Sequence, residues 1–292
     1  MKKSFIKIFV SFIILFTIFK LNKYSYSFNI LFSNLNLFFI YPLFLLISLI
    51  LISIRWKSII NNSNINYSFV DSFKISSISF GYNVATLSGA GDIFKLLIHQ
   101  KVSKEELVNS IILERYSGLI ITIIITFFVI GINFFKINLN EIIIYLLIIV
   151  IIFIVLFKSN FLFKSFPYLN ILNYKLSYLT NNTSLFFRSV AVSFFIQCSY
   201  YISNYILMKL FGIDLLFKEI IIFIILLSVA NFLPFTFSGF GSREVAVIIF
   251  STISDFEISY FIDFTLTLGL INLIYGLIFL IVSKKLILRT NV

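Results

Sequence analysis

Residues 231–249 read NFLPFTFSGFGSREVAVII and place a proline, two glycines, an arginine and a glutamate between two apolar runs. The runs cover residues 220–230 and 245–250. Inside a membrane, a helix break is tolerated only where the backbone is buried in protein or lines a wet cavity. An arginine–glutamate pair at that depth is costly unless it faces the protein interior or water. We therefore interpret this stretch as a candidate functional site inside a membrane-embedded bundle.

The composition of the whole chain is that of a membrane protein. Its 292 residues are 60% hydrophobic and 12% charged, and the mean hydropathy is +1.06. Ordinary soluble domains are about 45–50% apolar and about 25% charged. We expect an all-α fold: a polytopic membrane helix bundle of about six to eight spans. The whole chain, residues 1–292, is expected to form a single transmembrane domain.

Several classes of site are disfavoured by the residues that the chain carries. A single cysteine, Cys198, excludes an internal disulfide and a multi-cysteine metal site. The single histidine, His99, offers no metal-ligand spacing. The net charge of +11 indicates orientation and attraction to anionic headgroups, not nucleic-acid binding. We expect no metal, no cofactor and no catalytic residue.

Six apolar segments are interpreted as membrane spans; five are close to the length of about 20 residues that a helix needs, and the one at 105–135 is longer. Tyr41 and Trp56 bracket the second span in the manner of interfacial anchors. A basic loop at 158–188 has no acidic residue and is expected in the cytoplasm. Both termini are expected there too, with the protein in the plasma (inner) membrane as a multi-pass protein. The six segments are residues 4–19, 37–54, 105–135, 141–157, 189–211 and 259–282.

Two further apolar segments, residues 70–100 and 217–254, are interrupted by glycine. The arm at 93–100 that follows the first interruption is too short to span a bilayer. We interpret both segments as broken, re-entrant helical hairpins. The alternative of eight full spans stays open, because the charge distribution fits either topology. The backbone breaks are assigned to Gly89, Gly91, Pro234, Gly239 and Gly241.

The two breaks share a Ser-Gly-x-Gly core, at residues 88–91 and 238–241. Each precedes a short helical arm that begins with charge: Asp92 with Lys95, and Arg243 with Glu244. This echo predicts an inverted internal repeat whose broken helices meet within the membrane. The free N–H groups at the start of each arm favour an anion such as a phosphate.

Polar side chains also fall inside two of the predicted spans. Glu114 and Arg115 lie one or two turns inside the helix at 105–135. They form either an interfacial ion pair of little weight or a pair turned into the bundle near the glycine breaks. One face of the span at 189–211 carries a polar stripe, which indicates hydrogen bonds between helices or a cavity. The stripe consists of Ser193, Gln197, Tyr200, Tyr201 and Asn204.

Three ordered motifs resemble the flippase-like integral membrane family, whose best-known member domain is the transmembrane part of lysylphosphatidylglycerol synthase/flippase. Lys95 stands where the family usually has arginine, and a lysine cannot bind bidentately. The resemblance covers about residues 37–282, and no soluble C-terminal aminoacyl-transferase domain follows, so we expect the membrane half alone. The motifs are Gly91-Asp92 with Lys95, Glu114-Arg115 with Gly118-Leu119, and Leu233-Pro234 with Gly239 to Glu244.

The resemblance implies a protein that binds an anionic or modified phospho- or glycolipid headgroup, or translocates it between leaflets. Two alternatives remain: a membrane enzyme acting on a lipid phosphate, and an accessory subunit of cell-envelope or polysaccharide assembly. An enzyme is the less favoured, since no activated nucleophile or paired-carboxylate motif is recognisable. Partners are expected to be membrane lipids, an envelope-biosynthesis protein or a second copy of the chain. The headgroup-binding residues that the resemblance implies are Asp92, Lys95, Glu114, Arg115, Arg243 and Glu244.

Overall fold

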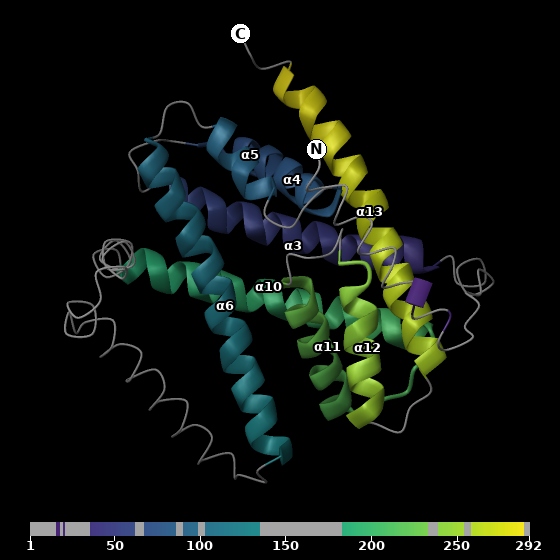
Figure 1. Cartoon of the computed structure of the whole chain (residues 1–292). Coiled ribbons are helices and arrows are strands. Elements are labelled where there is room, and N and C mark those ends of the chain that lie inside the picture. The colour runs from purple at the N-terminus through teal and green to yellow at the C-terminus, as the bar shows by residue number, and fades with distance from the viewer. Residues whose placement is uncertain are drawn as a thin grey trace.

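The computed structural model describes residues 16–17, 20, 36–61, 67–85, 90–98, 103–134, 183–232, 239–253 and 258–288. Within this part of the chain every regular element is helical (Figure 1), which confirms the all-α fold class. Each helix is apolar over most of its length, as expected where backbone groups must be paired within the helix itself. The helices are α3 (Asn36–Ile60), α4 (Phe69–Ala85), α5 (Ala90–Ile98), α6 (Lys104–Phe134), α10 (Thr183–Leu210), α11 (Phe217–Phe232), α12 (Ser242–Ile253) and α13 (Ile258–Leu288).

Four of these helices are long and apolar enough to cross a membrane, and each matches a predicted span. They agree with the polytopic bundle expected from the composition. The predicted spans at 4–19, apart from residues 16–17, and at 141–157 lie outside the described residues, as does the basic loop up to residue 182. The matching stretches are Ile40–Ile60 of α3, Lys104–Thr126 of α6, Thr183–Leu210 of α10 and Phe261–Ser283 of α13.

The second span is longer than predicted, and this changes the role of its flanking residues. Helix α3 continues to Ile60, so Arg55 and Trp56 lie inside the helix instead of just beyond its end. Trp56 and Tyr41 are both buried in the core. Interfacial anchors stand at headgroup level against lipid. The interpretation of these two side chains as an aromatic belt was therefore wrong, because both pack against other helices.

The two glycine-containing segments are each split into a pair of short helices. Helices α4 and α5 have 17 and 9 residues, and α11 and α12 have 16 and 12. All four are shorter than the about 20 residues that cross a bilayer. The helices of each pair contact each other. Gly89 and Pro234 lie outside the described residues, and the re-entrant course of both pairs stays a prediction.

Among the described residues, the helices occur twice in the same order: long, short, short, long. Helices α3 to α6 have 25, 17, 9 and 31 residues, and α10 to α13 have 28, 16, 12 and 31. The two first helices, α3 and α10, pack on each other. The second helix of each set packs on the last helix of the other set: α4 on α13 and α11 on α6. Order and packing both agree with the internal repeat predicted from the glycine breaks.

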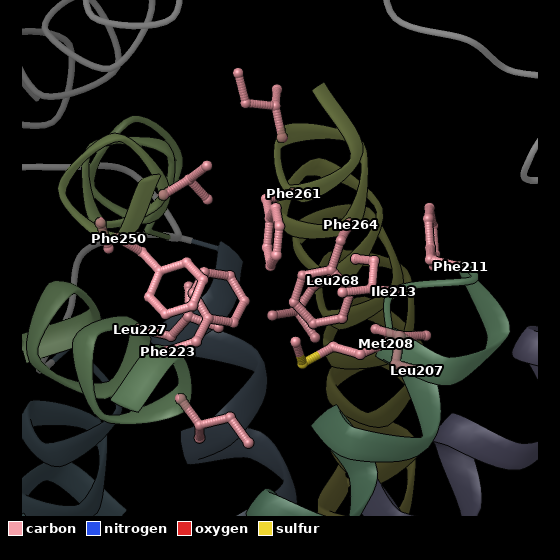
Figure 2. Packing of buried hydrophobic residues seen from close by; sticks show 14 of the residues in the cluster. Leu207, Met208, Phe211, Ile213, Phe223, Leu227, Phe250, Phe261, Phe264 and Leu268 are labelled. Atoms are coloured by element: carbon pink, nitrogen blue, oxygen red, sulfur yellow. The ribbon is translucent and has the colours of Figure 1, made fainter. Parts of the chain in front are cut away.

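A cluster of aromatic side chains forms the core of the second set (Figure 2). The Phe223 ring lies 5.0 Å from both Phe250 and Phe261 and 5.9 Å from Phe264, measured between centroids. These rings join α11, α12 and α13, and aromatic pairs at this spacing stabilise a core beyond the area that they bury. The cluster therefore holds the short helix α12, with its arginine and glutamate, against α13.

Helices α4 and α13 approach each other most closely at two glycines. A Cβ added at Gly81 would lie 2.6 Å from both the Gly276 carbonyl oxygen and Leu280 Cβ. A Cβ added at Gly276 would lie 3.1 Å from Val84. Small residues let two membrane helices bring their backbones together. This contact ties the first set of helices to the second.

The substitution Gly81→Ala is expected to lower the free energy of unfolding by about 1–3 kcal/mol, because the added methyl overpacks the contact between α4 and α13. Thermal unfolding in detergent measures the loss. Gly118→Ala on α6 is the matched control, since its added Cβ would meet nothing closer than Arg55 Nη1 at 3.8 Å. Equal unfolding temperatures for the two variants would contradict the close packing at Gly81.

Candidate functional site

Five charged side chains from α3, α5 and α6 gather into a connected group, called here the first charge group: Arg55, Asp92, Lys95, Glu114 and Arg115. One Glu114 carboxylate oxygen accepts from Arg55 Nη2 at 3.0 Å and the other accepts from Lys95 Nζ at 2.6 Å. Asp92 Oδ2 accepts from Nε and Nη2 of Arg115 at 2.9 and 2.6 Å. The two interpretations above therefore divide between the two residues: Glu114 turns into the bundle, while the Arg115 side chain is half-exposed and pairs with Asp92 beside the first glycine break.

The group has a buried part and a part that reaches the surface. Arg55, Lys95 and Glu114, the buried triad, are 8%, 3% and 6% exposed. The Arg115 side chain is 48% exposed and that of Asp92 is 20% exposed. Arg115 follows Glu114 in the chain, so the half-exposed pair lies directly beside the buried triad.

The buried triad is not electrically balanced. Two cations, Arg55 and Lys95, share the single carboxylate of Glu114, which leaves a formal charge of +1. Arg55 Nε is buried and makes no hydrogen bond to the described residues. The Ser110 hydroxyl, one turn before Glu114 on α6, is also buried and makes no hydrogen bond to the described residues. Because an unbalanced buried charge and unpaired buried donors are both costly, the arrangement suits an additional anionic group.

Neighbouring helices position the two cations of the triad. Arg55 passes over Gly118, where an added Cβ would lie at an ordinary contact distance of 3.8 Å from Arg55 Nη1. Arg55 Nη1 donates to Ser193 Oγ on α10 at 2.8 Å, and the Ser193 and Ser189 hydroxyls contact Ser117 Oγ at 3.1 and 2.9 Å. This hydroxyl cluster fixes the end of Arg55 that does not face Glu114.

Lys95 has an aromatic support in addition to its carboxylate. Its Nζ lies 4.3 Å from the centroid of the Trp56 ring, a distance at which a cation interacts favourably with an aromatic face. Trp56 is itself buried against residues of α4 and α6, including Ile75 and Leu107. The ring therefore keeps the lysine pointing at Glu114.

The break between α4 and α5 sets the position of Asp92 and Lys95. The Gly91 N–H donates to Asn83 Oδ1 at 2.9 Å, which satisfies one free donor at the start of α5. Any side chain at position 91 would overlap the carbonyl oxygen of Ser79. The glycine thus lets α5 fold back onto α4, and its charged residues follow within the next turn.

The second glycine break builds a separate polar group around Arg243 and Glu244, both buried. Gly239 and Gly241 have φ angles of 77° and 91°, the left-handed region that favours glycine. Glu244 Oε2 accepts the Gly241 N–H at 2.6 Å and so caps the start of α12. Arg243 Nε donates to the Gly239 carbonyl at 3.2 Å, and its guanidinium lies 5.3 Å from the Phe240 ring centroid.

Helices α13 and α3 enclose this second polar group. A Cβ added at Gly269 would lie 3.2 Å from Arg243 Nη2 and 2.7 Å from the Phe240 ring, so the glycine makes room for both. Tyr41, on α3, interacts electrostatically with Arg243 and donates a hydrogen bond to Asn272 Oδ1 at 3.2 Å. The environment of Arg243 is therefore drawn from both sets of helices.

The two polar groups lie at opposite ends of α3. Tyr41 near Arg243 and Arg55 near Glu114 are 14 residues apart, or about 21 Å along a helix that rises about 1.5 Å per residue. The structure therefore brings Asp92, Lys95, Glu114 and Arg115 together, as the sequence-based assignment grouped them, and places Arg243 and Glu244 elsewhere. Gly91, Gly239 and Gly241 stand at the two breaks.

Sequence reasoning missed Arg55, Trp56 and Gly269 as parts of these groups. Arg55 looked like a marker of the cytoplasmic end of a span, because basic residues often flank spans. The signal that could have corrected this is the helical spacing of Trp56, Ile59 and Ile60, which continues an apolar face beyond the arginine. The polar stripe of α10 was recognised, and the structure shows Ser193 bonded to Arg55 and Gln197 Nε2 donating to Thr122 Oγ1 at 2.9 Å.

Fold and site together define a multi-pass helical membrane protein whose interior carries a charged network. The family of the lysylphosphatidylglycerol synthase TM region matches residues 4–279, and the chain belongs to this family. No curated protein and no solved structure matches the chain. The family assignment confirms the resemblance drawn from the three sequence motifs, all of which fall within the matched residues.

Because the buried triad has two cations and one carboxylate, removing the charge of Glu114 should destabilise the protein more than removing the charge of Arg55. Glu114→Gln leaves two buried cations without a carboxylate and should lower the free energy of unfolding by about 3–5 kcal/mol. Arg55→Met leaves a balanced Lys95–Glu114 pair and should cost clearly less. Thermal unfolding of both variants in detergent gives the order. A larger loss for Arg55→Met than for Glu114→Gln would contradict the formal charge of +1.

Proposed function

We propose that the protein binds a lipid with an anionic or modified headgroup and translocates it between leaflets. The observation that carries the proposal is the buried triad of Arg55, Glu114 and Lys95, whose positive charge is unbalanced inside a membrane-spanning bundle. Buried charges within membrane helices mark substrate pathways and their counter-ions. Membership of a family named for a lipid synthase supports a lipid as the substrate.

A headgroup phosphate would meet Arg115 first, because this is the half-exposed cation of the group. The phosphate would replace Asp92 on Arg115, since an arginine binds phosphate and carboxylate with the same two-donor geometry. It would then lie next to the triad, where Arg55 Nε is an unused donor. Ile93 and Leu97, the exposed apolar residues of α5, would meet the acyl chains beside it.

Arg243 and Glu244 belong to the same proposal as the polar group at the other end of α3. The separation of about 21 Å is roughly two thirds of the hydrocarbon thickness of about 30 Å. A headgroup crossing the membrane would therefore find one polar group toward each side. Membrane lipids are the proposed partners, and the proposed location is the plasma membrane with both termini in the cytoplasm.

Reconstitution into liposomes tests the triad directly. Arg55→Met should slow leaflet exchange of a fluorescent anionic lipid by at least about tenfold, the cost of losing one charge-assisted hydrogen bond. Lys209→Ala is the control, because Lys209 is an exposed cation on α10 whose ion pair with Asp214 lies outside both polar groups. Exchange by Arg55→Met at the wild-type rate would refute the site. Chemical conversion of the lipid in detergent would support a membrane enzyme instead.

The second polar group generates its own test. Arg243→Ala should abolish leaflet exchange while the protein still inserts into the membrane, because the capping contact between Glu244 and the Gly241 N–H does not involve the arginine. Exchange rate and insertion are measured on the same preparation, again beside Lys209→Ala. An inserted Arg243→Ala variant that exchanges lipid normally would remove Arg243 from the proposed path.

A further inference from the structure

The balance of charges in the first charge group bears on which headgroup it accepts. Its three cations and two carboxylates are all joined by ion pairs and leave a formal charge of +1. We infer that this group selects lipids whose headgroup carries one net negative charge and an uncharged polyol, and rejects headgroups that carry ammonium groups. This inference rests on the proposed function and narrows its substrate class.

Charge counting separates two kinds of lipid. A phosphodiester with a glycerol or sugar headgroup carries one negative charge and brings the group to neutrality. A lysyl-modified phosphodiester carries two ammonium groups beside its phosphate, so the occupied group would hold a charge of +2. Excess charge of one sign is poorly tolerated where burial limits screening by water, and the triad is buried.

The hydrogen-bonding groups at the site lead to the same conclusion. An ammonium group has three donors and needs acceptors. In the buried triad the charged acceptor is engaged, because both Glu114 oxygens already accept, one from Arg55 and the other from Lys95. The next acidic side chain toward the start of α6, Glu106, lies about 12 Å from Glu114 along the helix. An ammonium group that reached the triad would thus have to displace Arg55 or Lys95 from Glu114.

Besides Arg55 Nε, several serine hydroxyls on α4 and α6 have no hydrogen-bond partner among the described residues. The buried hydroxyls of Ser72, Ser76 and Ser110 make no hydrogen bond to the described residues. Ser72 and Ser76 share the α4 face of Ser79, the residue against which Gly91 of α5 packs. Ser110 is one turn from Glu114 on α6. Hydroxyls both donate and accept, which suits the hydroxyls of a polyol headgroup.

A lipid series in proteoliposomes tests the selection. The bilayer is phosphatidylcholine, and the fluorescent tracer is phosphatidylglycerol, lysyl-phosphatidylglycerol or phosphatidylcholine. Phosphatidylglycerol should change leaflets at least about tenfold faster than the lysyl form, the ratio that one lost ion pair would produce. Equal or faster exchange of the lysyl form would overturn the inference and leave the proposed function standing. No acceleration of any tracer would overturn the proposed function itself.

A second experiment reverses the charge of Arg115, the half-exposed cation of the first charge group. Arg115→Glu changes the formal charge from +1 to −1 and should shift the exchange ratio at least about tenfold toward the lysyl lipid. Lys209→Glu, a reversal at a side chain of similar exposure, 41% against 48%, should leave the ratio unchanged. The neutral substitution Arg115→Gln should also shift the exchange ratio toward the lysyl lipid. It replaces Arg115→Glu in the experiment if the glutamate variant does not fold. An unchanged ratio in both Arg115 variants would refute the selection.

Discussion

The carboxylate of Glu114, shared between Arg55 and Lys95, is the interaction on which the first half of the structure depends. It joins three helices, α3, α5 and α6, at a place where water is scarce and each ion pair is strong. Two neighbouring features support the cations that share it: the Trp56 ring beside Lys95 and the Ser193 hydroxyl of α10, which accepts from Arg55. A neutral residue at position 114 would leave these supports around two repelling cations.

Much of this arrangement follows from local sequence rules. Span length and apolarity predicted α3, α6, α10 and α13, and glycine predicted the breaks before α5 and α12. The nearness of Asp92, Lys95, Glu114 and Arg115 also follows, because a short arm that folds back after Gly91 must return to the neighbouring helix. Each of these predictions uses residues that lie within about 30 positions of one another. Helix length and turn geometry are determined over similarly short stretches of sequence.

What local rules could not supply is how the two sets of helices pack on each other. Arg55 joins the site because α3 extends six residues beyond the predicted end at residue 54, so that the arginine lies within the helix and reaches Glu114 of α6. Arg243 resembles the first group in its glycine motif, yet it lies near Tyr41, which is about 21 Å along α3 from Arg55. Its neighbours Tyr41 and Gly269 come from helices on either side of the repeat. Such pairings depend on tertiary contacts that span up to 230 residues of sequence, as between Tyr41 and Asn272.

The crossed packing of the repeat has a mechanical consequence. Helix α4 of the first set packs on α13 of the second set, and α11 of the second set packs on α6 of the first. Each set of helices is therefore in contact with a short helix of the other. The two sets of helices cannot rotate apart about a single hinge without breaking the α4–α13 contact and the α11–α6 contact. At the glycine contact each glycine accommodates a side chain of the other helix, with Leu280 against Gly81 and Val84 against Gly276. A movement of one half would therefore displace an element that is packed against the other half.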